Sequence, residues 1–194
     1  MLSDQKIHFD ILALQEVGAV AQGTVTDYGF WNRNDPRLQL HDELNDYWVV
    51  CTDCLNSHLG QAILIDKSYT DGILGTLKGD RFIGAHLLHK SGAKMWILAG
   101  HLPHHQQPIM DYSNAMQELN SLLQRTQHSP CLVAADWNAT LSGTTLDAQA
   151  LQLACLVAES KCQLPMPKEP TWKNKTYDFF LASPLLLQNR SCCK

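Results

Sequence analysis

A carboxylate and an amide stand two positions apart at the end of an apolar run. The run covers residues 131–135 (CLVAA), and Asp136, Trp137 and Asn138 follow it directly. Residues i and i+2 of a pleated strand face the same side of a sheet. We therefore expect Asp136 and Asn138 to reach one spot, where their polar atoms suit a hard cation or a phosphate oxygen. An Asp and an Asn after a strand also commonly form a turn.

Three more apolar runs carry polar residues at one end. They are residues 9–14 followed by Gln15 and Glu16, residues 94–100 followed by His101, and residues 177–182 with Asp178 near their start. Buried runs of four to eight residues are typical of central sheet strands. A single polar residue at a strand end is often only a terminator, but the set of four strand ends favours one constellation at a sheet edge.

Further segments extend this pattern in a fixed order along the chain. They are residues 60–65 (GQAILI), 79–83 (GDRFI), 99–103 (AGHLP) and 170–172 (PTW). Together with the strand ends, they resemble the endonuclease/exonuclease/phosphatase superfamily of metal-dependent phosphodiesterases. Within it, the chain looks most like the endonuclease domain of non-LTR retrotransposon polyproteins. The resemblance implies an α/β fold of the α+β type, with two packed mixed β-sheets sandwiched between helices in a single domain over residues 1–194.

The resemblance also implies a role for each candidate residue. Glu16 matches the metal-binding glutamate, which would hold Mg²⁺ or Mn²⁺. Asp136 matches the aspartate that orients or activates the attacking water, and Asn138 matches the amide that holds the scissile phosphate. His101 matches a position that is a phosphate-contacting histidine in some members and a tyrosine in others. Asp178 matches a carboxylate that orients a catalytic imidazole. The implied reaction is metal-assisted attack of water on a phosphodiester.

Two segments that the resemblance implies do not occur in this sequence. The family opens with a strand that carries an Asn, whereas Met1 falls where the following helix is expected. The family closes with a strand and loop bearing an Asp-His pair, and no Ser-Asp-His triplet is present. We therefore expect a domain that lacks the first strand and the final strand-loop. Candidates to replace the missing histidine are His104 and His105, just past His101, and His86 and His89 on the neighbouring predicted strand.

Three functions remain open from the sequence. The first is metal-dependent hydrolysis of nucleic acid, with DNA favoured over RNA. The second is an inert remnant or binding module derived from a mobile-element endonuclease, because losing one member of a coupled catalytic unit costs several orders of magnitude in rate. The third is a phosphatase or phosphodiesterase acting on another phosphoester, because a fold alone does not set the substrate.

Charge is distributed unevenly along the chain. The net charge is −4, which argues against a protein that coats nucleic acid generally. However, residues 1–160 carry 9 basic and 17 acidic side chains, and residues 161–194 carry 6 and 2. Trp172 and Lys173 lie in this basic segment and are candidates to stack on a base and contact the phosphate backbone. The alternative is an ordinary solvated loop.

The remaining composition favours an intracellular protein, nuclear or cytoplasmic. No apolar run approaches the roughly 20 residues of a membrane span, and no charged-then-apolar leader is visible. The seven cysteines show no regular framework, which fits a reducing compartment. Apolar periodicity predicts two helices, over residues 110–125 and 144–159, the second capped by Thr144 with Asp147 three positions on.

Overall fold

Two β-sheets face each other in the computed structural model, which describes residues 9–15, 46–51, 60–141, 146–165 and 176–188. The three-stranded sheet has the order β1-β3-β2, and the five-stranded sheet has the order β4-β5-β6-β7-β8. Their bounds are β1 Ile11–Gln15, β2 Tyr47–Cys51, β3 Gln61–Asp66, β4 Thr70–Lys78, β5 Phe82–His89, β6 Lys94–His101, β7 Cys131–Asp136 and β8 Asp178–Ala182. All pairs are antiparallel except β6 with β7, so only the larger sheet is mixed. The predicted plan of two packed sheets with helices is confirmed.

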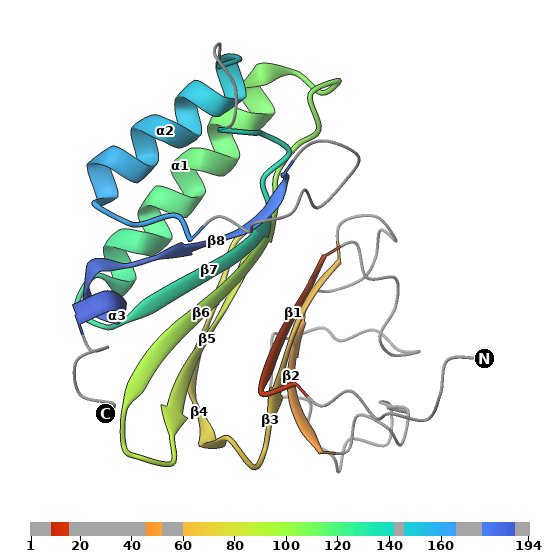
Figure 1. Cartoon of the computed structure of the whole chain (residues 1–194). Helices are drawn as coiled ribbons and strands as arrows, with labels where there is room; N and C mark the ends of the chain where they lie inside the picture. Colours follow the sequence, from red (N-terminus) through yellow and green to blue (C-terminus); the bar gives the residue numbers. More distant parts are fainter. Residues whose placement is uncertain (1–8, 16–45, 52–59, 142–145, 166–175, 189–194) are drawn as a thin grey trace.

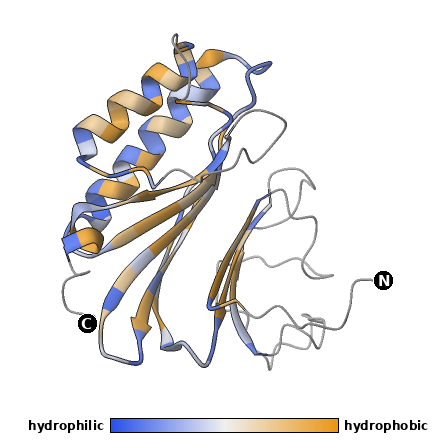
Figure 2. Ribbon diagram, viewed as in Figure 1, coloured by the Kyte–Doolittle hydropathy of each residue, from blue (hydrophilic) through white to orange (hydrophobic). Residues whose placement is uncertain are grey.

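The space between the sheets is filled by alternate residues of their strands. Ile63 and Ile65 of β3 belong to one buried cluster with Ile97 and Ala99 of β6, and none of the four is more than 1% exposed. β-Branched residues at every second position favour a pleated strand with one face in the core. Figure 2 shows the strands as mainly hydrophobic where the two sheets approach each other. This shared core fixes which strand ends meet at the same rim.

Two long helices cover the outer face of the five-stranded sheet, as Figure 1 shows. α1 spans Ile109–Thr126, close to the predicted 110–125, and it buries the expected apolar stripe. α2 spans Ala148–Ser160, so its predicted start at Thr144 is wrong. Asp147 is itself the N-cap, because its carboxylate accepts a hydrogen bond from the Ala150 N–H at 2.8 Å. A short helix, α3 (Pro184–Gln188), follows β8, and no helix in the described segments is long and apolar enough to cross a bilayer.

The end of β6 is shaped by close packing between Gly100 and Phe82. Phe82 is fully buried, and a Cβ built on Gly100 would lie 2.1 Å from a carbon of its ring. An aromatic ring held in a dense core cannot move aside as a flexible side chain can. Gly100 is therefore required where β6 delivers the residue that follows it, His101.

We expect Gly100→Ala to lower the free energy of unfolding by about 1–3 kcal/mol, because the Phe82 ring must be displaced. Denaturant unfolding measures this change. Gly75→Ala in β4 is the matched control, because a Cβ there meets no heavy atom within 4 Å. Equal unfolding midpoints for the two variants would contradict the proposed packing constraint.

Candidate active site

Three of the predicted site residues lie side by side at one end of the five-stranded sheet. Asp136 of β7 pairs in register with His101 of β6 on one side and with Asp178 of β8 on the other. By strand alternation these side chains lie on the same face as Ala99 and Leu132, which belong to the core between the sheets. His101, Asp136 and Asp178 therefore form a polar row at one end of the core between the sheets. His101 is buried, Asp136 is half-buried and Asp178 is exposed.

Asn138 reaches the same spot through a turn rather than through strand alternation. β7 ends at Asp136, and Asn138 has a φ of 46°, in the left-handed region that Asn tolerates better than most residues. The backbone N–H of Asn138 donates to Oδ1 of Asp136 at 3.0 Å. The prediction that the two residues converge as i and i+2 of one strand is wrong. They share a turn in which the aspartate carboxylate holds the asparagine backbone.

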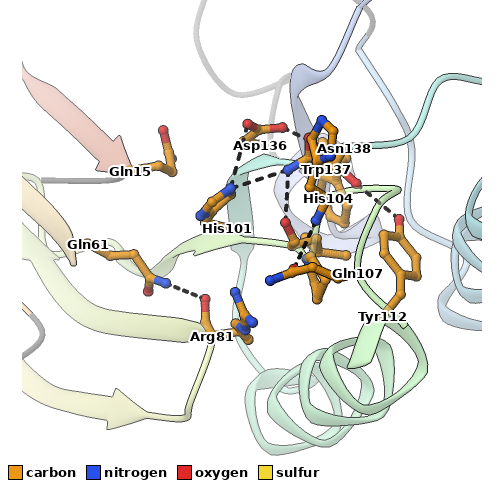
Figure 3. A network of polar contacts seen from close by, with 12 residues as sticks. Gln15, Gln61, Arg81, His101, His104, Gln107, Tyr112, Asp136, Trp137 and Asn138 are labelled. Carbon is orange, nitrogen blue, oxygen red and sulfur yellow. Dashed lines mark hydrogen bonds and ion pairs between the residues drawn. The ribbon is translucent and has the colours of Figure 1, made fainter. Parts of the chain in front are cut away.

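The side-chain amide of Asn138 links this turn to β6. Its Nδ2 donates to the Leu102 carbonyl at 2.9 Å and lies 3.2 Å from Nε2 of His101. A carbonyl can only accept, so the atom beside it is the amide nitrogen, and Nε2 of His101 must accept the second hydrogen bond. Neutral His101 then carries its proton on Nδ1. Nε2 also lies 3.9 Å from Oδ2 of Asp136, which offers a partner to the protonated imidazole. Figure 3 shows the three side chains converging.

Trp137 anchors the turn from the opposite side. The indole is fully buried, stacks on Phe179 with ring centroids 5.2 Å apart, and donates from Nε1 to the Phe179 carbonyl at 2.9 Å. The Trp137 carbonyl accepts a hydrogen bond from the hydroxyl of Tyr112 on α1 at 3.1 Å. Burial, and then the charges of Asp147 and Asp136, raise the pKa of Tyr112, so this hydroxyl remains a donor. Trp137 thus holds in place the residues on either side of it, Asp136 and Asn138, which carry polar groups of the site.

A second pair of polar side chains approaches from the three-stranded sheet. Gln15 and Gln61 are register partners on β1 and β3. Nε2 of Gln15 lies 3.4 Å from the Ala134 carbonyl of β7, across the space between the sheets. Nε2 of Gln61, a residue only 1% exposed, donates to the Arg81 carbonyl at 2.6 Å. Figure 3 shows both glutamines on the opposite side of the site from Asn138.

Gln61 and Arg81 were not identified as site residues from the sequence. The available signal was Gln61 itself, a polar residue that opens the apolar run 61–65 as His101 closes another. Glu16, Trp172 and Lys173 lie outside the described residues. Of the histidines considered as replacements, His86 pairs with Trp96, five residues before His101 on β6, which is about 17 Å along a strand. His104 and His105 are exposed just past the strand end.

Two substitutions of Asn138 separate the effect of its backbone conformation on stability from the effect of its side chain. Asn138→Gly removes the amide bonds to Leu102 and His101 but keeps a residue that tolerates positive φ. Asn138→Ala loses the same bonds and adds left-handed strain, so it should be less stable than Asn138→Gly by about 1–2 kcal/mol. Denaturant unfolding of both proteins measures this difference. If the alanine variant were as stable as the glycine variant, the left-handed turn would be wrong.

The described residues provide suitable donor atoms for a metal but do not complete a site. Asp136 and Asp178 offer carboxylate oxygens, the hard donors that Mg²⁺ prefers. Among the described segments, however, no group of three His, Cys, Asp or Glu side chains is placed to hold an ion. The chemistry of the donor set therefore fits Mg²⁺ in type, and a further ligand is needed.

Comparison with known proteins supports this fold. A scan of protein-family models and a search of curated proteins found no match. Among solved structures, the human Nocturnin catalytic domain with bound sulfate anion superposes with a TM-score of 0.58 at 18% identity, covering 90% of this chain and 69% of that one. The endonuclease domain of TRAS1, a telomere-specific non-LTR retrotransposon, gives 0.58 at 12% identity, covering 74% and 69%. An endonuclease/exonuclease/phosphatase family protein from Bacteroides thetaiotaomicron gives 0.53 at 12%, covering 73% and 62%.

These structures confirm, at the level of fold, the resemblance seen in the sequence. The chain spans between 62% and 69% of the length of the three proteins. The described sheets, their order and the superposition lead to one conclusion. This chain has the fold of the endonuclease/exonuclease/phosphatase proteins, among them a retrotransposon endonuclease domain.

Proposed function

We propose that this protein hydrolyses phosphodiester bonds of nucleic acid with the help of a divalent metal ion. The observation that carries the proposal is the cluster of Asp136, Asn138 and His101, brought within hydrogen-bond and ion-pair distance at one rim of the sandwich. The cluster combines a proton acceptor with two groups that can bind phosphate oxygens. The solved structures that share the fold include a retrotransposon endonuclease domain, which supports the same class of reaction.

In the proposed reaction, a water oxygen attacks the phosphorus while the bond from phosphorus to the leaving oxygen breaks. Asp136 orients the water and accepts its proton, because a half-buried carboxylate next to an amide and an imidazole is a suitable acceptor. The leaving oxygen takes a proton from solvent. On substrate binding, the Asn138 amide would exchange its hydrogen bond to Nε2 of His101 for one to a non-bridging phosphate oxygen, and protonated His101 would donate from Nε2 to a second such oxygen. Asp178, in register with Asp136, is proposed to keep the family's role of orienting a catalytic imidazole, a partner for which this sequence has no matching Ser-Asp-His triplet.

Mg²⁺, when bound, would stabilise negative charge on the phosphoryl group. We propose Glu16 as its protein ligand, following the family resemblance of the segment that begins with β1. Glu16 follows Gln15, whose amide spans the two sheets next to β7. Trp172 and Lys173 are proposed to contact the substrate, by stacking and by charge, which favours a nucleic acid over a small phosphoester.

The substrate class and metal requirement can be tested with the whole chain and three substrates. These are supercoiled plasmid DNA, a single-stranded RNA oligonucleotide, and an inositol phosphate that offers only monoesters. We expect nicking of the plasmid in Mg²⁺ that stops on addition of EDTA and returns with excess Mg²⁺. If the protein released phosphate from the inositol phosphate and cleaved neither nucleic acid, its function would be that of a phosphatase. Binding of plasmid without cleavage would support the binding-module alternative.

A further inference from the structure

The side chain of Glu118 on α1 binds backbone N–H groups in the turn between β4 and β5. The Glu118 carboxylate accepts hydrogen bonds from the Arg81 N–H, at 3.1 Å and 3.2 Å to its two oxygens, and from the Phe82 N–H at 3.0 Å. Burial raises the pKa of Glu118, and the N–H groups of Arg81 and Phe82 act in the opposite direction. A half-buried carboxylate that accepts hydrogen bonds from two backbone amides makes a strong and directional contact.

Gly79 makes room for this contact. A Cβ built on Gly79 would lie 1.9 Å from Oε1 of Glu118 and 2.5 Å from its carboxyl carbon. The turn is also closed by the Gly79 N–H, which donates to the Phe82 carbonyl at 2.8 Å. A side chain at position 79 would therefore compete with the carboxylate for the same space. The Glu118 carboxylate thus occupies the space that a Cβ at position 79 would fill.

The turn that Glu118 holds is in contact with the proposed phosphate-binding residue His101. The Arg81 carbonyl accepts a hydrogen bond from the His101 N–H at 3.3 Å and a second from Nε2 of Gln61 at 2.6 Å. The neighbouring Phe82 packs its ring on Gly100, the residue before His101. The turn thus meets the end of β6 by a hydrogen bond and by packing. Both contacts start from residues whose N–H groups are bound to Glu118.

We propose that Glu118 is a positioning residue for His101, acting through the backbone of residues 79–82 without touching the substrate. The proposal rests on the proposed function for its kinetic consequence, but its structural consequence is independent of any activity. Releasing the turn frees the Arg81 carbonyl and the Phe82 ring together, so the end of β6 loses two restraints. A small displacement of a group that binds the reacting phosphate is expected to slow the reaction more than it weakens binding.

Three variants and one control separate positioning from general stability. Glu118→Ala removes the carboxylate, Gly79→Ala displaces it, and Glu118→Gln keeps the shape and one carbonyl acceptor. Asp111→Ala is the matched control, because Asp111 lies about two turns before Glu118 on the same face of α1 and lines the same depression. Thermal unfolding identifies which variants are folded. Glu118→Gln and Gly79→Ala carry the test if Glu118→Ala does not fold.

The first measurement is the NMR signal of the His101 ring and of the Asn138 side-chain amide in each folded variant. We expect Glu118→Ala and Gly79→Ala to move both signals, Glu118→Gln to move them less, and Asp111→Ala to leave them in place. The second measurement is plasmid nicking, where kcat should fall about tenfold in Glu118→Ala with KM changed less than about twofold. Unchanged His101 signals in folded Glu118→Ala and Gly79→Ala would overturn the positioning role. If the wild-type protein shows no cleavage, the proposed function fails while the NMR comparison still decides the role of Glu118.

Discussion

Asp136→Asn should reduce the rate of phosphodiester cleavage by roughly 10³–10⁴-fold while leaving the fold intact. The amide oxygen of Asn can still accept the N–H of Asn138, which Oδ1 of Asp136 accepts at 3.0 Å. The turn is therefore preserved. An amide cannot take the proton of the attacking water, and it offers no negative charge to a protonated His101. Initial rates of plasmid nicking in Mg²⁺, at matched protein concentration, measure the loss.

Asp111→Asn is the control for this comparison, because Asp111 lies on the first turn of α1 rather than in the polar row. It should cut at the wild-type rate. The unfolding midpoints of the three proteins show whether a loss of rate reflects a loss of folded protein. Equal rates of plasmid nicking by the wild type and Asp136→Asn would show that the Asp136 carboxylate has no role in the reaction.

Trp137→Ala should lower the free energy of unfolding by about 3–5 kcal/mol, the range typical of a fully buried aromatic residue. The indole is 0% exposed and stacks on Phe179, so its removal leaves a cavity beneath the site. Because the residues on either side of it carry the polar groups, the same change should also abolish cleavage. Denaturant unfolding gives the stability change.

Trp137→Phe separates packing from hydrogen bonding at this position. It keeps a stacked ring but leaves the Phe179 carbonyl without the Nε1–H donor, for an expected cost of about 1–3 kcal/mol. This variant should retain most of its cleavage activity once folded. A loss below about 1 kcal/mol in Trp137→Ala would show that the indole does not hold the turn.

The strands could be predicted because buried apolar runs carry their own signal. The runs around β6, β7 and β8 are short, apolar and bounded by polar residues, and the structure places them as neighbours in one sheet. Register then follows from pairing, which brings His101, Asp136 and Asp178 into one row. The likeness of order and spacing to a known family supplied the arrangement of the two sheets, which periodicity alone does not specify.

The local geometry of the site could not be predicted in the same way. Strand alternation correctly predicts that Asp136 and Asn138 lie close together, but the reason is wrong. Asn138 reaches Asp136 through a turn with a left-handed backbone conformation. The start of α2 was misplaced because Asp147 can serve either inside a capping box or as the cap itself. Such alternatives differ by about 1 kcal/mol in local preference, and tertiary contacts decide between them.

Contacts that link distant segments had even less sequence signal. Gln61 binds a carbonyl 20 residues away, and Glu118 binds amides 36 and 37 residues away. Neither residue stands out by type, since Gln and Glu are common on strand ends and helix surfaces. Only the packing of α1 and β3 around the turn between β4 and β5 shows that they serve the same region.

The convergence of separate strands on one phosphate can be tested by titrating a deoxydinucleotide, with Mg²⁺ present, into isotope-labelled protein. The ring nitrogens of His101 and the side-chain amide of Asn138 should shift along a single binding curve, because both contact the same group. If those two signals stay fixed while residues elsewhere respond, the row at this rim is not where the substrate binds.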